Sequence, residues 1–238
     1  MRAHVSTLIN IHHVADTRGF RVIWLCEELG LKYDVKPVDF SASYRSSAEW
    51  RKMNPVGKVP VMTIRDDNNP LDPQFKLFES GAMVQHILDR FGDGRLQPPH
   101  GTDKHGTFLQ WCWFAEATFS RATGELANHK RAFSEAGLVE PVMEEMRSRA
   151  RSCMSALDDE LASHGEAFLL GEDFTAADIM MGYALQSFDR NVGAEEPFPP
   201  AAAAYWQRLQ QRPAFEAAAV ANKMRLALRG TCKVKFRL

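Results

Sequence analysis

Two short segments in the first third of the chain carry side chains suited to binding an anion. Thr17 and Arg18 offer a hydroxyl donor and a fixed positive charge just before an apolar helical stretch. Glu79 and Ser80 are the first residues of a second apolar helical stretch. A helix N-terminus presents unpaired N–H groups and partial positive charge, so it suits a carboxylate or a thiolate. Both pairs can therefore form an anion site, but a hydroxyl or an acid in a first turn is also an ordinary helix cap, and for Glu79 and Ser80 the residues alone favour the cap.

A third segment, Asn54 to Val61, places Pro60 where a β-rich stretch begins. Because proline cannot donate to a β-ladder, Pro60 must lie at a sheet edge, at a strand start or in a cis turn. A cis bond would turn the backbone N–H and C=O of Val59 outward, where a peptide-like ligand could pair with them as an added strand. The alternative is an edge-strand proline without a ligand.

The elements that must position these residues follow from hydrophobic periodicity. Gly30 supplies a stop for the first helix, and the helix that begins at Glu79 has a clear apolar face. The order is strand, helix, strand, helix, strand, strand, helix, which predicts an α/β unit of about 90 residues. The strands are expected within 7–13, 33–40, 59–64 and 75–78, and the helices within 20–29, 43–53 and 79–91.

The rest of the chain has a different organisation. Glycine and proline are frequent in 92–101, which is typical of a linker. From Thr102 onward, apolar residues recur with a helical period nearly throughout. We therefore predict a first domain over 1–92, a linker over 93–101 and an all-α domain over 102–238. Helices are expected around Trp111 and within 138–161, 176–188 and 201–212. The basic tail from Lys223 to Leu238 is expected to be solvated or to pack against another subunit.

The composition excludes several classes of protein. The 238 residues are 45% hydrophobic and 25% charged, with a net charge of −1, so neither disorder nor a nucleic-acid partner is expected. No apolar stretch approaches the length of about 20 residues that a membrane span needs. The four cysteines lie far apart without a C-x-x-C pair, and His12 and His13 point to opposite faces of a strand, so no metal site is expected. We expect a cytoplasmic protein with reduced thiols.

Five segments, in order, resemble the glutathione transferase superfamily. The resemblance spans about 200 residues and implies a thioredoxin-like α/β N-terminal domain, an all-α helical-bundle C-terminal domain and a homodimer. The segments are RVIWLCEELGL (21–31), NPVGKVPV (54–61), LFESGA (77–82), FTAADI (174–179) and WQRLQQRPAF (206–215).

The resemblance also implies how glutathione, as co-substrate, is held. Glu79 would bind the γ-glutamyl ammonium, and Ser80 with its N–H would bind the neighbouring carboxylate. The backbone of Val59, before a cis Pro60, would pair with the cysteinyl unit. Lys58 would reach the glycyl carboxylate, or it is an ordinary solvated lysine.

The group that activates the glutathione thiol is harder to assign. Family members use a tyrosine or serine hydroxyl, or sometimes a cysteine or asparagine, near the start of the first helix. Counting back from Arg21 places the family's serine at Thr17, which has the required hydroxyl, whereas the usual Ser-Arg-Ser string is absent. Arg18 stands where glutaredoxin-like members place a cysteine and would stabilise a thiolate by its charge. The remaining interpretation is that Asp16 or Thr17 only caps the helix.

The resemblance implies a glutathione transferase that conjugates the thiolate to a hydrophobic electrophile. Two alternatives stay open. The unusual loop from Asp16 to Gly19 is consistent with a non-catalytic glutathione-binding or assembly module on the same fold. A glutathione-dependent reductase or isomerase is the other, although a covalent glutaredoxin-type mechanism is disfavoured because 12–20 contains no cysteine.

Overall fold

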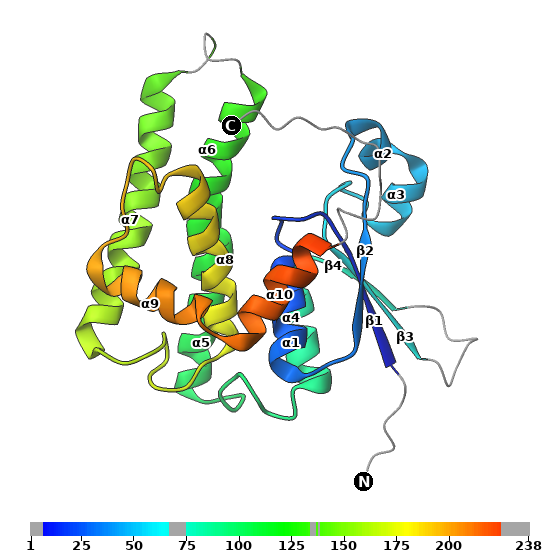
Figure 1. Cartoon of the computed structure of the whole chain (residues 1–238), viewed down its shortest axis with the longest axis horizontal. Helices are drawn as coiled ribbons and strands as arrows, with labels where there is room; N and C mark the ends of the chain where they lie inside the picture. The colour runs from blue at the N-terminus through cyan, green and yellow to red at the C-terminus, as the bar shows by residue number, and fades with distance from the viewer. Residues whose placement is uncertain (1–6, 67–74, 134–136, 138, 225–238) are drawn as a thin grey trace. The chain divides into compact units, whose positions relative to one another are not determined.

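The computed structural model describes residues 7–66, 75–133, 137 and 139–224, which fall into two compact units (Figure 1). The first unit comprises Met1–Val84 together with Pro213–Leu238, and the second comprises Gln85–Arg212. The segment 67–74 between the third and fourth strands, and the basic tail beyond Met224, lie outside the described residues.

The first unit is built on a four-stranded mixed sheet, as predicted. Its order is β2-β1-β3-β4, with β1 and β2 parallel and the other two pairs antiparallel. Isoleucines of β1 are buried, and Ile11 lies between Val35 and Met62 of the neighbouring strands. The strands are β1 (Thr7–His13), β2 (Tyr33–Pro37), β3 (Val61–Asp66) and β4 (Phe75–Phe78).

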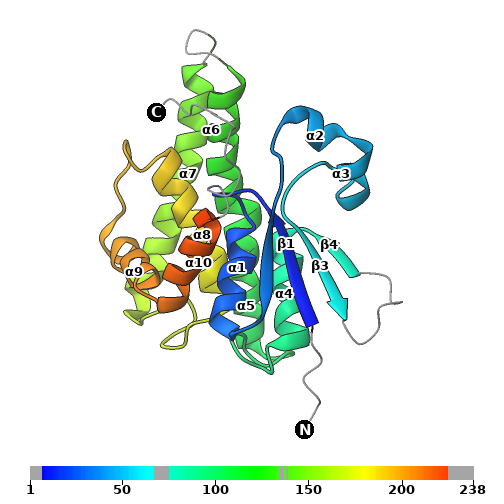
Figure 2. The ribbon, with the colours of Figure 1, turned by 45° about the vertical axis from the view of Figure 1, so that its right-hand side comes forward.

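The strand register brings three chain segments to one end of the sheet. Val61, the first residue of β3, pairs with His12 near the end of β1 and with Phe78 at the end of β4. The segment after β1, the segment before β3 and the segment after β4 therefore all leave the sheet at the same end. Figures 1 and 2 show the antiparallel strands from two sides.

Helix α1 (Phe20–Leu29) is buried on nearly all sides and ends at Gly30, whose φ is +66° as the prediction required. Helix α10 (Pro213–Met224) lies beside it (Figures 1 and 2). The ring of Phe215 meets Phe20 and Trp24 edge-on, with centroids 5.4 and 4.9 Å away. This differs from the predicted domain boundaries, which placed all of 102–238 in one helical domain. The helix expected within 201–212 ends at Gln210, and the chain from Pro213 onward forms α10, which packs on the sheet unit.

Two further differences concern the connection between β2 and β3. The single helix expected over 43–53 is two helices, α2 (Ala42–Ser46) and α3 (Ala48–Met53). Ser47 separates them because its backbone is extended and its hydroxyl accepts a hydrogen bond from the N–H of Trp50, which caps α3. The strand β2 also ends at Pro37, three residues earlier than expected.

The second unit is helical, so the predicted order of a thioredoxin-like α/β unit and an all-α unit is confirmed. Helix α8 lies at its centre with twelve of sixteen residues buried, and it packs against α5, α6 and α9. None of the described helices combines the length and the apolar character that a membrane crossing needs. The helices are α4 (Ser80–Phe91), which joins the two units, α5 (Asp103–Trp113), a π-helical turn (Phe114–Phe119), α6 (Ser120–Ala132), α7 (Glu140–His164), α8 (Ala176–Asn191) and α9 (Pro200–Gln210).

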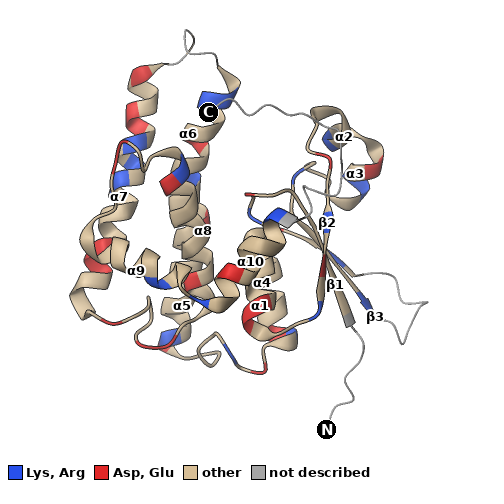
Figure 3. Ribbon diagram, in the orientation of Figure 1, with Lys and Arg blue, Asp and Glu red and all other residues tan. Residues whose placement is uncertain are grey.

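Helix α7 carries charges of both signs along its length (Figure 3). Arg147 pairs with Glu140 and Glu144 on its own helix, and Arg151 pairs with Glu144 and with Glu196 from beyond α8. Most of these carboxylates are exposed, so each pair contributes little stability on its own. The paired charges are typical of a solvated helix face.

Asp178 is the polar centre of the helical unit. Its side chain is fully buried and accepts hydrogen bonds from the N–H of Leu169 (3.1 Å), from the N–H and hydroxyl of Thr175 (2.7 and 3.1 Å) and from the Tyr205 hydroxyl (2.8 Å). Thr175 and Asp178 also form a capping box at the start of the helix that begins at Ala176.

We expect Asp178→Ala to lower the free energy of unfolding by about 3–5 kcal/mol, because it leaves several buried donors without an acceptor at about 1–3 kcal/mol each. Urea unfolding of the whole chain, followed by circular dichroism, measures the change. Asp189→Ala, an exposed position on the same helix, is the control and should stay within about 0.5 kcal/mol of the unchanged protein. Equal stability of the two variants would contradict the assignment.

Candidate functional site

All seven sequence-predicted site residues lie in the sheet unit, on the three segments that meet at one end of the sheet. Thr17 and Arg18 belong to the loop between β1 and α1, and Lys58 precedes β3. Glu79 and Ser80 follow β4. The register of β1, β3 and β4 therefore brings together groups that are more than 60 residues apart in the chain.

The Val59–Pro60 peptide bond is cis. Pro60 is buried, Val59 is half-buried and Lys58 is exposed. Asn54, itself only 4% exposed, holds this turn from inside. Its side-chain Nδ2 donates to the Lys58 carbonyl (2.9 Å), and its side-chain Oδ1 accepts from the Val56 N–H (3.0 Å). The backbone just before β3 is therefore fixed by a buried side chain rather than by strand pairing alone.

Gly57 lies in the same turn with a φ of +72°. A Cβ at this position would come within 2.5 Å of the Arg45 carbonyl oxygen in α2. Glycine is needed here both for the left-handed backbone and for the close approach of the two chain segments.

Glu79 and Ser80 present contrasting groups at the start of α4. The Glu79 side chain is exposed and its backbone has a φ of +75°, a left-handed conformation that is uncommon for a residue with a side chain. Its carbonyl accepts the N–H of Met83 and so begins the helix. Ser80 is only 3% exposed. An exposed carboxylate thus stands beside a hydroxyl at a helix N-terminus, a combination that can bind an ammonium and a carboxylate of one molecule.

Arg21 joins the first turns of α1 and α4, and the sequence reasoning did not assign it to the site. Its guanidinium is fully buried, and Nη1 donates to the Ser80 hydroxyl oxygen at 3.3 Å. Because Ser80 accepts this bond, its own hydroxyl proton stays available to a ligand. The signal in the sequence was a single charge inside the apolar run from Phe20 to Leu25.

Thr17 does not cap α1, so the capping interpretation is wrong for this residue. The start of α1 has no side-chain cap; instead the N–H groups of Phe20 and Arg21 bind the carbonyls of Thr17 and Arg18 at 3.0 and 3.3 Å. The half-buried Thr17 hydroxyl donates to the Val14 carbonyl (2.7 Å) and lies 3.2 Å from the imidazole Nδ1 of His13. Arg18, the alternative, is also half-buried.

His13 and Asn222 form a second contact that sequence reasoning missed. His13 is 2% exposed, and its Nε2 lies 2.7 Å from the side-chain oxygen of Asn222 on α10. The Asn222 amide also donates to the Asp16 carboxylate at 3.2 Å. Burial lowers the pKa of His13, opposed by the Asn222 hydrogen bond and by Asp16. No local pattern connects two residues 209 positions apart.

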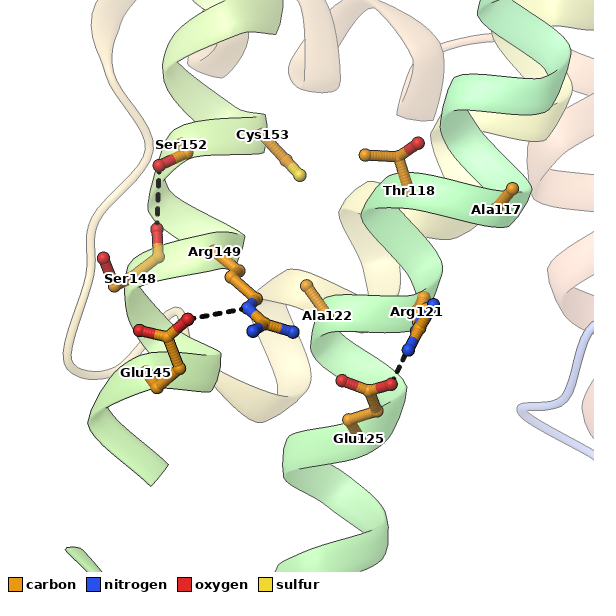
Figure 4. A pocket seen from close by; sticks show the side chains of 10 residues that line it. All are labelled: Ala117, Thr118, Arg121, Ala122, Glu125, Glu145, Ser148, Arg149, Ser152 and Cys153. Atoms are coloured by element: carbon orange, nitrogen blue, oxygen red, sulfur yellow. Dashed lines mark hydrogen bonds and ion pairs between the residues drawn. The ribbon is translucent and has the colours of Figure 1, made fainter. Parts of the chain in front are cut away.

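The helical unit contains a separate hollow of about 640 Å³ between α6 and α7 (Figure 4). Its charged groups are paired along each helix, Arg121 with Glu125 and Arg149 with Glu145. Burial raises the pKa of the Cys153 thiol, so this thiol stays protonated and a weak nucleophile. The hollow therefore lacks the reactive groups that the sheet unit provides.

Comparisons with known proteins match both units. Residues 6–89 match the family described as "Glutathione S-transferase, N-terminal domain", and residues 140–213 match "Glutathione S-transferase, C-terminal domain". Glutathione S-transferase 1 of Saccharomyces cerevisiae is 22% identical over 204 residues, covering 81% of this chain and 86% of its own. Glutathione S-transferase-like protein OpS6 of Beauveria bassiana is 26% identical over 218 residues, covering 90% and 95%.

A solved structure has the same fold. The glutathione transferase URE2P8 of Phanerochaete chrysosporium, crystallised with oxidised glutathione, superposes with a TM-score of 0.77 at 24% identity. The similarity covers 96% of this chain and 100% of that one.

Gly57→Ala tests whether the turn before β3 depends on the close approach to Arg45. We expect it to destabilise the protein by about 1–3 kcal/mol more than Gly30→Ala, because overpacking against a backbone carbonyl adds to the strain of a positive φ. Gly30 is the matched control: it has a similar φ of +66°, and a Cβ there would meet no other atom within 4 Å. Denaturant unfolding of both variants measures the difference, and equal losses would refute the steric argument.

Proposed function

The chain belongs to the glutathione S-transferase superfamily, and from this we propose that it is a glutathione transferase. It binds glutathione at the end of the sheet, holds the thiol as a thiolate and conjugates it to a hydrophobic electrophile. The observation that carries the proposal is the register of β1, β3 and β4, because it places Thr17, the cis Val59–Pro60 step and Glu79–Ser80 at one end of one sheet.

Each end of glutathione has a suitable partner in this arrangement. The exposed Glu79 carboxylate binds the γ-glutamyl ammonium, and Ser80 with the α4 N-terminus binds the carboxylate beside it. The backbone of Val59 pairs with the cysteinyl unit as an added strand. The exposed Lys58 supplies a charge for the glycyl carboxylate. The buried contacts of Arg21 with Ser80, and of Asn54 with the turn, support this assignment because they fix the binding groups in advance.

Thr17 is the group we propose to stabilise the thiolate. A free thiol with a pKa of about 8.5 is only a few per cent ionised near pH 7, so the site must favour the anion. The first N–H groups of α1 already bind the carbonyls of Thr17 and Arg18, which leaves a side-chain donor as the stronger candidate. Arg18 is the second choice and would act through its charge.

The alternatives share the glutathione site and differ in the reaction of the bound molecule. A cysteine-based reductase is the less favoured, because the loop before α1 contains no cysteine and the thiol on α1, Cys26, is buried, which raises its pKa. Two further alternatives would use the same binding residues: a reductase or isomerase that uses the bound thiolate, and a non-catalytic binding module. They differ from a transferase in what happens to glutathione after it binds. A homodimer and a hydrophobic second substrate are further proposals that rest on the family relationship. The cytoplasmic location stays a prediction.

Glu79→Gln should weaken glutathione binding by about 10- to 100-fold, because it removes a charge-assisted contact with the ammonium group. Isothermal calorimetry measures the affinity. Glu49→Gln in α3 removes the same charge from another exposed position and should leave binding unchanged. Loss of affinity in both variants, or in neither, would rule out the specific role of Glu79.

Thr17→Ala should lower kcat/KM for an aryl halide electrophile by about 100-fold, because one donor to the developing anion is lost. Thr17→Ser keeps the hydroxyl and should retain most of the rate. Glutathione affinity should change little in either variant, since the hydroxyl acts on the thiol and not on the charged ends. A rate that survives in the alanine variant but falls in Arg18→Met would transfer the role to Arg18.

A further inference from the structure

We propose that His13 accepts the thiol proton of bound glutathione through the Thr17 hydroxyl, with Asn222 holding the imidazole in the required tautomer. The proposal rests on the proposed function, because it needs glutathione bound with its thiol at Thr17. It assigns a chemical role to a buried histidine and to an asparagine near the end of the described chain.

The hydrogen bonds of Asn222 determine which of its side-chain atoms faces His13. One atom donates to the Asp16 carboxylate (3.2 Å), which can only accept, so that atom is the nitrogen. The other accepts from the backbone N–H of Asp16 (3.3 Å), so it is the oxygen. This oxygen lies 2.7 Å from Nε2 of His13. Nε2 must therefore carry a proton, and in the neutral imidazole Nδ1 has a free lone pair.

That lone pair faces the Thr17 hydroxyl. Nδ1 and Oγ1 are 3.2 Å apart, while the same Oγ1 is 2.7 Å from the Val14 carbonyl. The hydroxyl has one proton and two acceptors within reach, so rotation about the Cβ–Oγ bond directs the proton to either one. When it points to Nδ1, the lone pairs of Oγ1 are left to accept a proton from the thiol.

Every proton that moves in this step stays on the thiol, Thr17 or His13. The thiol proton passes to Oγ1 of Thr17 as the Thr17 hydroxyl proton passes to Nδ1 of His13. The products are a thiolate and an imidazolium, with Thr17 again a neutral hydroxyl that donates to the sulfur. No proton enters or leaves the site, and a thiolate paired with an imidazolium is a stable combination in proteins.

The surroundings of His13 suit a base that is neutral until the thiolate forms. Burial lowers its pKa, which keeps the free imidazole unprotonated, and among the described residues Asp16 is the charged group that acts on it. Two neighbours of the ring from other segments, Asn222 of α10 and Gly19 ahead of α1, are uncharged, and so is Pro37, the register partner of His13 on β2. A thiolate next to this ring would supply the negative charge that stabilises its protonated form.

Gly19 keeps the ring in place for this contact. A Cβ at this position would lie 2.3 Å from Nδ1 of His13. The backbone of Gly19 has an ordinary helical φ of −63°, so the glycine is required by the imidazole and not by its own conformation. The loop is therefore shaped around the nitrogen atom that the proposal uses.

Proton counting separates this relay from a purely structural role of His13. Glutathione binding to the unchanged protein is followed near pH 7 by thiolate absorbance, and the protons released are obtained by calorimetry in buffers of different ionisation enthalpy. S-methylglutathione, which has no thiol proton, supplies the background count. We expect about zero net protons per thiolate formed, whereas a thiolate stabilised only by Thr17 would send about one proton to solvent.

Substitutions of the two neighbouring histidines identify the group that accepts the thiol proton. In His13→Gln we expect less thiolate near pH 7, and about one proton released for each thiolate that still forms. His12→Gln is the matched control: this neighbouring histidine lies near Trp50 instead, with ring centroids 6.4 Å apart, and its replacement should leave the proton count unchanged.

The outcomes are distinct. Thiolate formation with about one proton released by the unchanged protein would overturn the relay and leave the proposed function intact. Glutathione binding without any thiolate, or no binding at all, would overturn both the relay and the proposed function. The measurement on the unchanged protein decides the matter even if His13→Gln does not fold.

Discussion

The position of Val61 between His12 and Phe78 is the constraint on which the rest of the site depends. Because β3 begins where β1 and β4 end, three unrelated stretches of chain leave the sheet together. Val61, Met62, Thr63 and Ile64 are all buried, so both faces of β3 are packed. A shift of one residue in either ladder would put Val61 and Thr63 where Met62 and Ile64 now pack, and the packing on the two faces therefore fixes the register. The same packing that stabilises the unit therefore assembles its chemistry.

Three groups at this end of the sheet are each held by a buried partner from another element. Ser80 is bound by Arg21 of α1, and the turn before the cis proline is bound by Asn54. Thr17 lies against His13, whose ring is in turn held by the final described helix. Buried polar groups with partners are rigid, and a rigid site loses less conformational entropy when it binds a ligand. The polar contacts thus connect packing with binding.

Helix α10 has two roles in the sheet unit. Its apolar side packs Phe215 against Phe20 and Trp24, which are both fully buried on α1. About two turns further along α10, the Asn222 side chain forms hydrogen bonds with His13 and Asp16, which precede α1. The final described segment of the chain therefore stabilises α1 and orders the loop that carries Thr17.

Sequence reasoning predicted the elements with strong local signals. The helix over 20–29, its stop at Gly30 and the order of four strands agree with the structure, although the bounds of β2 and β3 differ. The family resemblance implies the three site segments and the cis proline. The failures have physical reasons. Ser47 breaks a polar helix because its hydroxyl caps the next one, which propensity alone does not reveal. The contacts of Arg21 with Ser80, and of His13 with Asn222, are tertiary and leave no pattern between neighbours in the chain.

In the function we propose, this end of the sheet binds glutathione and ionises its thiol. The most direct test is a spectroscopic titration of protein-bound glutathione, in which thiolate absorbance is followed against pH. We expect the bound thiol to ionise with a pKa well below the ordinary value of about 8.5 for a free thiol. Binding with an unshifted pKa would contradict activation and favour a non-catalytic glutathione-binding module. Absence of binding would contradict the site itself.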